Sequence, residues 1–490
     1  MSSVGFRRLL NVLFHPLPAA IFALCLGLLL FDAFPIDSLS YHIPFASRFL
    51  QLPGFPDFTN YFEDRYQGFP VLWRLFLGPG LIFNHQRLFV LPNLAALSLL
   101  IYCSRRILFI SAPLIFCCCV AFPVAIFGFR SSLQDFFVNV MVLVALISLL
   151  QTLPAIKVTG ETPRWLNWWD LVGLTCLALA ANIKFQGLFM AILVISAATF
   201  FRLHDASKTC KRLRRPARLK LILMSILLIL ILAQPIHNLL KFGNPMYPIK
   251  FLGLPAPEAR MFSPIQYIPK VPFVANAASY LSSVLEIDPI IRSKAGFSFK
   301  RSWHNHNSPK DGYKPNAADY PYVVTGGSNG LLFFSLFTGA FLSVYQLRGN
   351  VSVTPVLILR RRMLLTSLGF MWLPQSMELR YYMSALFVPA LVAVSGDKTQ
   401  LRQFMRWIVV AGVWFVLMTS FMLPVYFWAR TGQWIRSDGL LSPDIYRNFP
   451  SSQSCLQKYK TWDGLISNNF GGKPSEVQAS MGCYFRLANP

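Results

Sequence analysis

Charged residues are scarce in this chain, and acidic residues are the scarcest of them. Only 13% of the 490 residues are charged, whereas soluble domains carry roughly 25%. Apolar runs recur along the sequence at lengths near the roughly 20 residues that cross a hydrocarbon core. A soluble protein would show shorter runs interrupted by polar residues at helical spacing. The deficit of charge therefore excludes a soluble domain and indicates an integral membrane protein.

The shortage of acids leaves a net charge of +25, from 45 Lys and Arg against 20 Asp and Glu. In a soluble protein this excess would suggest nucleic-acid binding. Here much of it falls in short segments between apolar runs, where Lys and Arg bias a loop to stay cytoplasmic. The basic residues therefore act as topology signals, and no nucleic-acid partner is expected.

No pair of cysteines has the spacing of a zinc finger. Cys455 and Cys483 lie in the polar C-terminal tail and could form a disulfide if that tail faces an oxidising compartment. His304 and His306 resemble half of a metal site, but no carboxylate or cysteine accompanies them. An ordinary polar loop that could contact a sugar or phosphate is the expectation there. No cofactor is expected, although a divalent metal would be compatible with the sequence.

The apolar runs predict an all-α membrane bundle with about eleven crossings. Arg7 and Arg8 precede the first run, which lacks the small-residue cleavage site of a signal peptide and is expected to remain as the first helix. The predicted helices span about 16–34, 87–103, 107–128, 131–152, 166–183, 185–202, 219–236, 328–347, 363–375, 380–396 and 406–428.

A shorter apolar segment, residues 69–83, is expected to lie in the membrane interface, because prolines and Arg74 interrupt it. If it crossed the membrane, every later loop would change sides. With the interfacial placement, the basic clusters at 202–220, 348–362 and 398–406 all face the cytoplasm. The N-terminus is then cytoplasmic, and the C-terminus lies outside.

This topology divides the chain into four regions. An N-terminal membrane module covers 1–238 and contains a long first outer loop at 35–86. A large outer loop follows at 239–327, then C-terminal membrane helices at 328–428 and an outer tail at 429–490. No internal repeat of convincing period is present in the sequence, which argues against a transporter built from inverted repeats.

Polar side chains gather where the predicted helices reach the outer face. Some follow the predicted helices at 16–34 or 166–183, and others lie at the start of those at 131–152 or 380–396. Each could be an ordinary charge at a helix boundary or a basic side chain that extends to the interface. The candidates are Asp37, Tyr41, His42, Asp135, Lys184, Gln186, Arg380 and Tyr381.

In their order along the chain, these motifs resemble the GT-C class of membrane glycosyltransferases. The similarity is to the bacterial branch related to protein O-mannosyltransferases and the aminoarabinose transferase of lipid A. It covers about the first 250 residues and the region around Arg380, and the first loop lacks the tight Asp-Glu pair of several members. The matching segments are the Asp, Tyr and His of 37–42, Arg-Ser-Ser-Leu-Gln-Asp at 130–135, Asn-Ile-Lys-Phe-Gln-Gly at 182–187, Gly-Asn-Pro-Met-Tyr-Pro at 243–248 and Glu-Leu-Arg-Tyr-Tyr at 378–382.

The resemblance implies an enzyme that moves a sugar from polyprenyl phosphate to a glycan, lipid or protein acceptor at the periplasmic face of a bacterial inner membrane. Inverting displacement needs a base near the acceptor hydroxyl, and Asp37 or Asp135 would supply it. The lipid phosphate leaves with developing charge, which fixed cations such as Lys184 and Arg380 would stabilise.

The large outer loop supports an alternative. It carries ten Lys or Arg against five acids, which suggests an anionic neighbour such as lipid phosphate, a pyrophosphate carrier or a charged polysaccharide. Its Arg and His residues at 292–306 would suit a polysaccharide polymerase or ligase that acts on a glycan linked to lipid pyrophosphate. A transporter is the third reading, and it would show pairs of broken helices with buried charges near the middle of the membrane.

Overall fold

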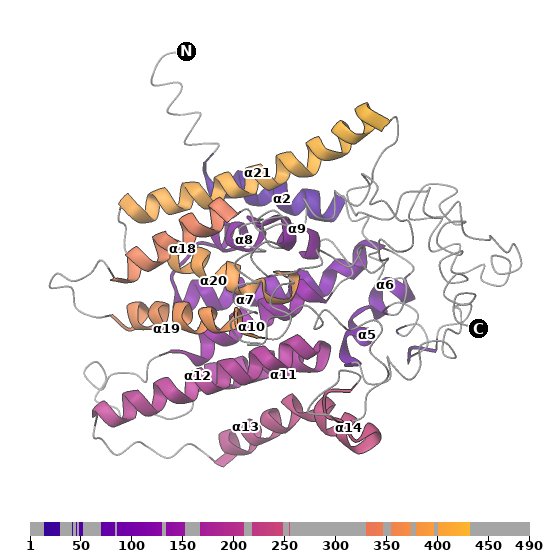
Figure 1. Ribbon diagram of the computed structural model, residues 1–490, viewed down its shortest axis with the longest axis vertical. Coiled ribbons are helices and arrows are strands. Elements are labelled where there is room, and N and C mark those ends of the chain that lie inside the picture. Colours follow the sequence, from indigo (N-terminus) through magenta and orange to yellow (C-terminus); the bar gives the residue numbers. More distant parts are fainter. Residues whose placement is uncertain are drawn as a thin grey trace, which may run out of the picture.

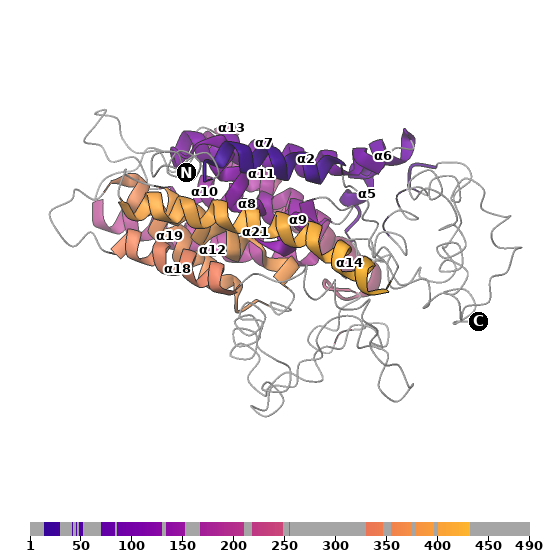
Figure 2. The ribbon, with the colours of Figure 1, turned by 90° about the horizontal axis from the view of Figure 1, so that it is seen from above.

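The computed structural model describes part of the chain, and every regular element within that part is a helix. The described residues are 14–29, 42, 46, 49–51, 70–83, 86–129, 134–151, 167–209, 218–247, 254, 330–345, 354–373, 379–395 and 400–431. In Figure 1 the long helices lie side by side in layers, from α21 and α2 at the top to α13 and α14 at the bottom. The view from above in Figure 2 shows the same helices as a slab.

The helices follow the apolar runs closely, since each run of that length can satisfy its backbone hydrogen bonds only as a helix within a bilayer. Their bounds are α2 Pro16–Leu29, α5 Leu72–Phe76, α6 Gly78–Ile82, η2 Gln86–Val90, α7 Leu91–Ile107, α8 Ala112–Val120, α9 Pro123–Phe129, α10 Asp135–Leu149, α11 Trp168–Ile183, α12 Phe185–Thr209, α13 Arg218–Ile231, α14 Ala233–Phe242, α18 Gly330–Tyr345, α19 Pro355–Phe370, η7 Leu379–Tyr382, α20 Ser384–Val394 and α21 Gln400–Thr431.

Three helical stretches in the described residues are long and apolar enough to cross a membrane: Leu88–Ile107, Phe185–Ser207 and Gln400–Met418. The pair α13 and α14, bent by 46°, makes a fourth if it is one span. Five further apolar helices are shorter, at 10–17 residues. The fold is therefore a helical bundle with three or four candidate spans, and the full set of eleven crossings stays a prediction.

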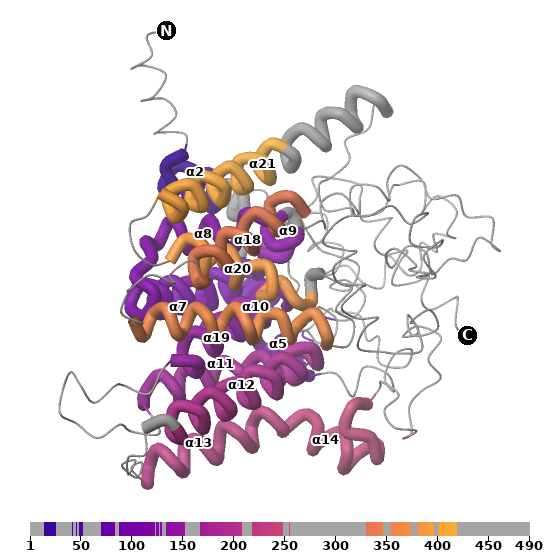
Figure 3. Tube along the Cα trace, turned by 60° about the vertical axis from the view of Figure 1, so that its left-hand side comes forward, coloured from indigo at the N-terminus to yellow at the C-terminus, as the bar shows by residue number. Residues whose placement is uncertain are grey.

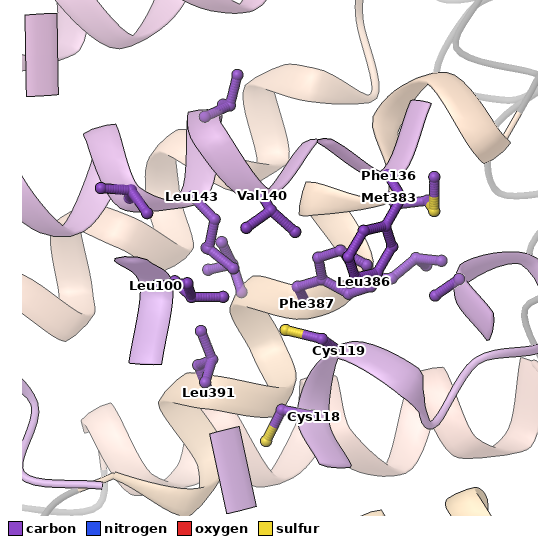
Figure 4. Packing of buried hydrophobic residues seen from close by; sticks show 14 of the residues in the cluster. Leu100, Cys118, Cys119, Phe136, Val140, Leu143, Met383, Leu386, Phe387 and Leu391 are labelled. Carbon is purple, nitrogen blue, oxygen red and sulfur yellow. The ribbon is translucent and has the colours of Figure 1, made fainter. Parts of the chain in front are cut away.

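The centre of the bundle is formed by α10 and α20, in which every residue is buried. Both helices are mostly apolar around their whole circumference, as expected of helices that neighbours surround completely. Figure 4 shows Phe136 and Val140 of α10 lying close to Phe387 of α20, with Leu100 of α7 and Cys119 of α8 beside them. Helices α7, α11 and α12 also pack against α10.

Arginine side chains gather at one end of the bundle, which we call the basic end. It lies at the left of Figure 1, where α12 ends and α21 begins. Their guanidinium groups donate hydrogen bonds to backbone carbonyls at helix C-termini. These carbonyls lack hydrogen-bond partners inside the helix and carry partial negative charge. The contacts are Arg202 to Leu149 O at 3.2 Å, Arg360 to Val392 O at 3.0 Å, Arg361 to Val344 O at 3.1 Å, Arg362 to Leu150 O at 3.3 Å and Arg402 to Val394 O at 2.7 Å.

Two ion pairs, each at least partly buried, reinforce the basic end: Asp170 with Arg202, and Asp205 with Arg362. The basic clusters that the sequence assigned to one membrane face therefore meet at one end of the bundle. The tube in Figure 3 shows the same end from another side, with the starts of α13 and α21 on the left and α14 on the right.

One helix differs from the predicted bounds in a way that matters for the charges. The sequence predicted a helix at 363–375 after a loop that contains Arg360, Arg361 and Arg362, and these helix bounds were wrong. The structure has α19 at Pro355–Phe370, with all three arginines inside it. The helix accepts these charges because carbonyls at neighbouring helix ends and Asp205 bind them.

Two further predicted segments are broken. The run at 107–128 forms α8 and α9, separated at 121–122 before Pro123, as expected where a proline disfavours helical geometry in the residue before it. The segment 69–83, predicted as one interfacial helix, forms the five-residue helices α5 and α6. Trp73 of α5 is buried, with its ring centre 5.7 Å from that of Phe137 on α10, so the segment packs against the bundle near the start of α10.

Candidate functional site

The structure describes half of the predicted site residues with their side chains: His42, Asp135, Lys184, Gln186 and Tyr381. The backbone of Arg380 belongs to η7, but its side chain lies outside the described part. Predicted residues wholly outside the described part are Asp37, Tyr41, His304 and His306, as are the predicted disulfide partners Cys455 and Cys483.

Asp135 opens α10 and is 1% exposed. Its carboxylate belongs to the first turn, where the unpaired N–H groups of a helix favour a negative charge. Its backbone carbonyl accepts a hydrogen bond of 2.8 Å from Asn139 one turn later. The first turn of α10 therefore presents a buried carboxylate.

Lys184 occupies the single extended residue between α11 and α12, with φ −153° and ψ 142°. The two helices meet so closely there that a Cβ on Gly187 would lie 2.1 Å from the carbonyl oxygen of Ala180. The N–H of Gly187 donates to Lys184 O at 2.9 Å and the N–H of Lys184 donates to Ala180 O at 3.1 Å. Glycine at position 187 thus permits the tight break that holds Lys184 in place.

Lys184 and Asp135 form a buried ion pair through Nζ and Oδ1. The same ammonium lies 4.0 Å from the centre of the Tyr381 ring, in cation–π geometry. Three elements that are distant in sequence, α10, the α11–α12 break and η7, meet at this point. Gln186 and His42 are both buried as well, and Gln186 lies two residues after Lys184.

Asn139 joins these elements and was not among the predicted site residues. Its side-chain N–H donates to Tyr381 O at 3.2 Å, and its oxygen accepts from the N–H of Ser384 at 2.8 Å. It is fully buried, and a buried amide costs free energy unless it is hydrogen-bonded. A single Asn within an apolar run, one helical turn after Asp135, was the signal in the sequence.

Two buried side-chain oxygen atoms at the start of α10 have no hydrogen-bond partner within the described residues: Asp135 Oδ2 and Gln134 Oε1. An unsatisfied buried acceptor costs roughly 1–3 kcal/mol. A ligand hydroxyl could donate to either of them. The arrangement therefore combines a carboxylate acceptor with a fixed cation a few ångströms away.

The Gly-Asn-Pro-Met-Tyr segment has a structural explanation. Gly243 ends α14 with φ +68°, a left-handed conformation that glycine adopts without strain. Asn244 Oδ1 accepts from the N–H of Met246 at 2.9 Å, and Asn238 Nδ2 donates to Tyr247 O at 2.9 Å. These bonds fold the chain back after α14, so the motif forms a turn at this end of the bundle.

The other ionisable side chains do not suggest a metal centre. Among the residues that the structure describes, no group of three or more His, Cys, Asp or Glu side chains could hold a metal ion. Compared with protein-family models, with curated proteins and with solved structures, the chain matches none of them.

Proposed function

We propose that the chain is a membrane glycosyltransferase that moves a sugar from a polyprenyl-phosphate donor to an acceptor outside the cytoplasm. The observation that supports this most is the meeting of a buried carboxylate, an ammonium and an aromatic ring at the end of the bundle opposite the basic end. The proposal includes about eleven crossings of a bacterial inner membrane, a cytoplasmic N-terminus and a periplasmic C-terminus.

Each of the proposed site residues would have a separate role in the reaction. Asp37 takes the proton of the acceptor hydroxyl, whose oxygen attacks the anomeric carbon as the bond to the lipid phosphate breaks. The phosphate leaves with the electron pair, and Lys184 and Arg380 stabilise its charge. Asp135 holds Lys184 in position through their ion pair, and this leaves Asp37 the base role.

The test uses the full-length protein in proteoliposomes with a panel of polyprenyl-phosphate sugars tritiated in the sugar. We expect label to leave the lipid with the native protein. Asp37→Asn should lower the rate by about 10²–10⁴-fold, the usual effect of losing a general base, and Lys184→Met should also slow transfer strongly.

A control is Asp170→Asn, which removes a carboxylate at the basic end that is as buried as that of Asp135. It should retain transfer when folded protein is compared at equal amounts. Normal transfer by both Asp37→Asn and Lys184→Met, or equal losses in all three variants, would contradict the proposed site.

A transporter is a second candidate, favoured by the helix breaks. The α11–α12 break carries Lys184, and α13 and α14 are bent by 46°, which resembles the discontinuous helices of transporters. The same proteoliposomes discriminate between the two functions. Accumulation of a soluble radiolabelled sugar phosphate, with the lipid-linked sugar left intact, would favour transport.

A further inference from the structure

Arg406, in the second turn of α21, is a cation without a protein partner in the described part of the chain. It is partly buried, and its Nε is fully shielded from solvent but makes no hydrogen bond there. By contrast, Arg402, one turn earlier on α21, donates to Val394 O at 2.7 Å. A shielded polar atom without a partner is costly, so the Nε of Arg406 requires an explanation.

The helices around Arg406 offer no acidic side chain. Helix α21 packs against α2, α8, α18 and α20, and its place beside α2 is visible in Figures 1 and 2. None of these five helices contains an Asp or Glu. The guanidinium lies within electrostatic range of the Cys118 thiol on α8. These helices therefore cannot neutralise its charge.

The start of α2 lies at the same level as this part of α21. Pro16 begins α2, and its carbonyl oxygen lies 3.5 Å from Sγ of Cys117, the neighbour of Cys118. Just before it, the ring of Phe14 lies 6.4 Å from that of Trp407. This helix start offers an anion no free N–H in its first three residues, because Pro16 and Pro18 have none and the N–H of Leu17 donates to His15 Nδ1 at 3.3 Å. The start of α2 therefore lies beside the second turn of α21, and Arg406 is the cation that this region offers to an anion.

The lipid-facing exterior of the bundle is apolar at this position. Phe404 is 54% exposed and Trp407 44% exposed, and Leu17 of α2 is also exposed. Large apolar side chains with a tryptophan are typical of the level where acyl chains meet headgroups. We therefore expect the bound anion to be the charged group of an amphipathic molecule.

We propose that the junction of α2, α8 and α21 binds the phosphate headgroup of an anionic phospholipid, with Arg406 as the principal cation. The acyl chains lie along the exposed side chains of Leu17, Phe404 and Trp407. The site belongs to the leaflet at the basic end. It depends on the membrane assignment of the bundle and not on the proposed transfer reaction.

The experiment is a lipid titration of the purified full-length protein in detergent, followed by native mass spectrometry. We expect the native protein to bind dioleoylphosphatidylglycerol more tightly than dioleoylphosphatidylcholine. Arg406→Gln should weaken the first about fivefold and leave the second unchanged, since one basic residue contributes about 1 kcal/mol at an anionic surface and 1.4 kcal/mol is tenfold.

The control is Arg105→Gln, which removes an exposed arginine from the last turn of α7 and changes the net charge equally. It should keep the lipid preference of the native protein. If Arg406→Gln does not fold, Arg406→Lys serves in its place, with a smaller loss expected because Lys lacks the planar fork.

Three outcomes would overturn the proposal. One is a native protein that does not distinguish the two lipids. Another is the same loss of phosphatidylglycerol binding in the Arg105 and Arg406 variants. The third is competition by millimolar glycerol 3-phosphate as effective as the lipid itself, which would assign the site to a soluble phosphate.

Discussion

Asp135 and Lys184 are 49 positions apart in the chain, yet their side chains form an ion pair where α10 begins and α11 ends. The carboxylate is 1% exposed and the lysine 14% exposed. A second pair, Asp170 with Arg202, links the beginning of α11 to α12 at the opposite end. The first pair joins α10 to the α11–α12 break, and the second joins α11 to α12. Of these two pairs, the first leaves a buried carboxylate oxygen without a hydrogen bond within the described residues, whereas Asp170 Oδ2 accepts from the N–H of Asn167.

The Asp135–Lys184 pair should show strong coupling in a double-mutant cycle. Asp135→Asn leaves the lysine without its counter-charge and should lower the free energy of unfolding by roughly 3 kcal/mol, as for other broken buried pairs. Lys184→Met leaves the carboxylate unpaired and should have a similar effect. The double variant should be less destabilised than the sum, measured by thermal unfolding in detergent. Simple additivity of the two changes would show that the pair is not coupled.

Gly187 should not tolerate a side chain. In Gly187→Ala, the new Cβ would meet the backbone oxygen of Ala180 at 2.1 Å, so α11 and α12 must separate and Lys184 must shift. We expect a loss of about 1–3 kcal/mol, typical of overpacking. Gly78→Ala is the control, because its nearest atom would be Leu50 Cδ1 at an ordinary 3.4 Å. Equal melting temperatures for the two variants would contradict the close helix contact.

Substitution of Gly243 should destabilise the protein through its backbone conformation and not through a steric clash. Its φ is +68°, and no atom lies within 4 Å of the position that a Cβ would occupy. Gly243→Ala should therefore lower the free energy of unfolding by about 1–2 kcal/mol through the left-handed backbone alone. Gly243→Asn should cost less, since Asn adopts this conformation more readily. Thermal unfolding of the two variants side by side measures the difference, and an unchanged Gly243→Ala would exclude the left-handed cap.

The charge-based topology predicts that Cys210, in the basic loop between α12 and α13, is cytoplasmic. In a Cys455→Ser, Cys483→Ser background, a membrane-impermeant maleimide should label it only after the cells are permeabilised. Ser308→Cys, in the large outer loop, should be labelled in intact cells. Labelling of Cys210 from outside would reverse the proposed orientation.

Composition and hydropathy alone determined that the chain is helical and where most helices lie. The helices at 168–183, 330–345 and 384–394 lie within a few residues of the predicted bounds. The hydropathy of an apolar run depends only on its own residues, so it can be read from the sequence alone. The basic clusters also indicated which helix ends lie together. That information was present in the order of charged segments and needed no contact between them.

The tertiary structure decided which polar groups meet and where helices break. Only packing of α10 against α11 and η7 brings Asp135, Lys184 and Tyr381 together, and only that packing reveals Asn139 as the residue that links them. Likewise, Arg360 to Arg362 lie inside α19 because carbonyls of other helices bind them. A hydropathy profile places the end of a membrane helix at such residues. The free-energy cost of burying their charge depends instead on partners that distant segments supply.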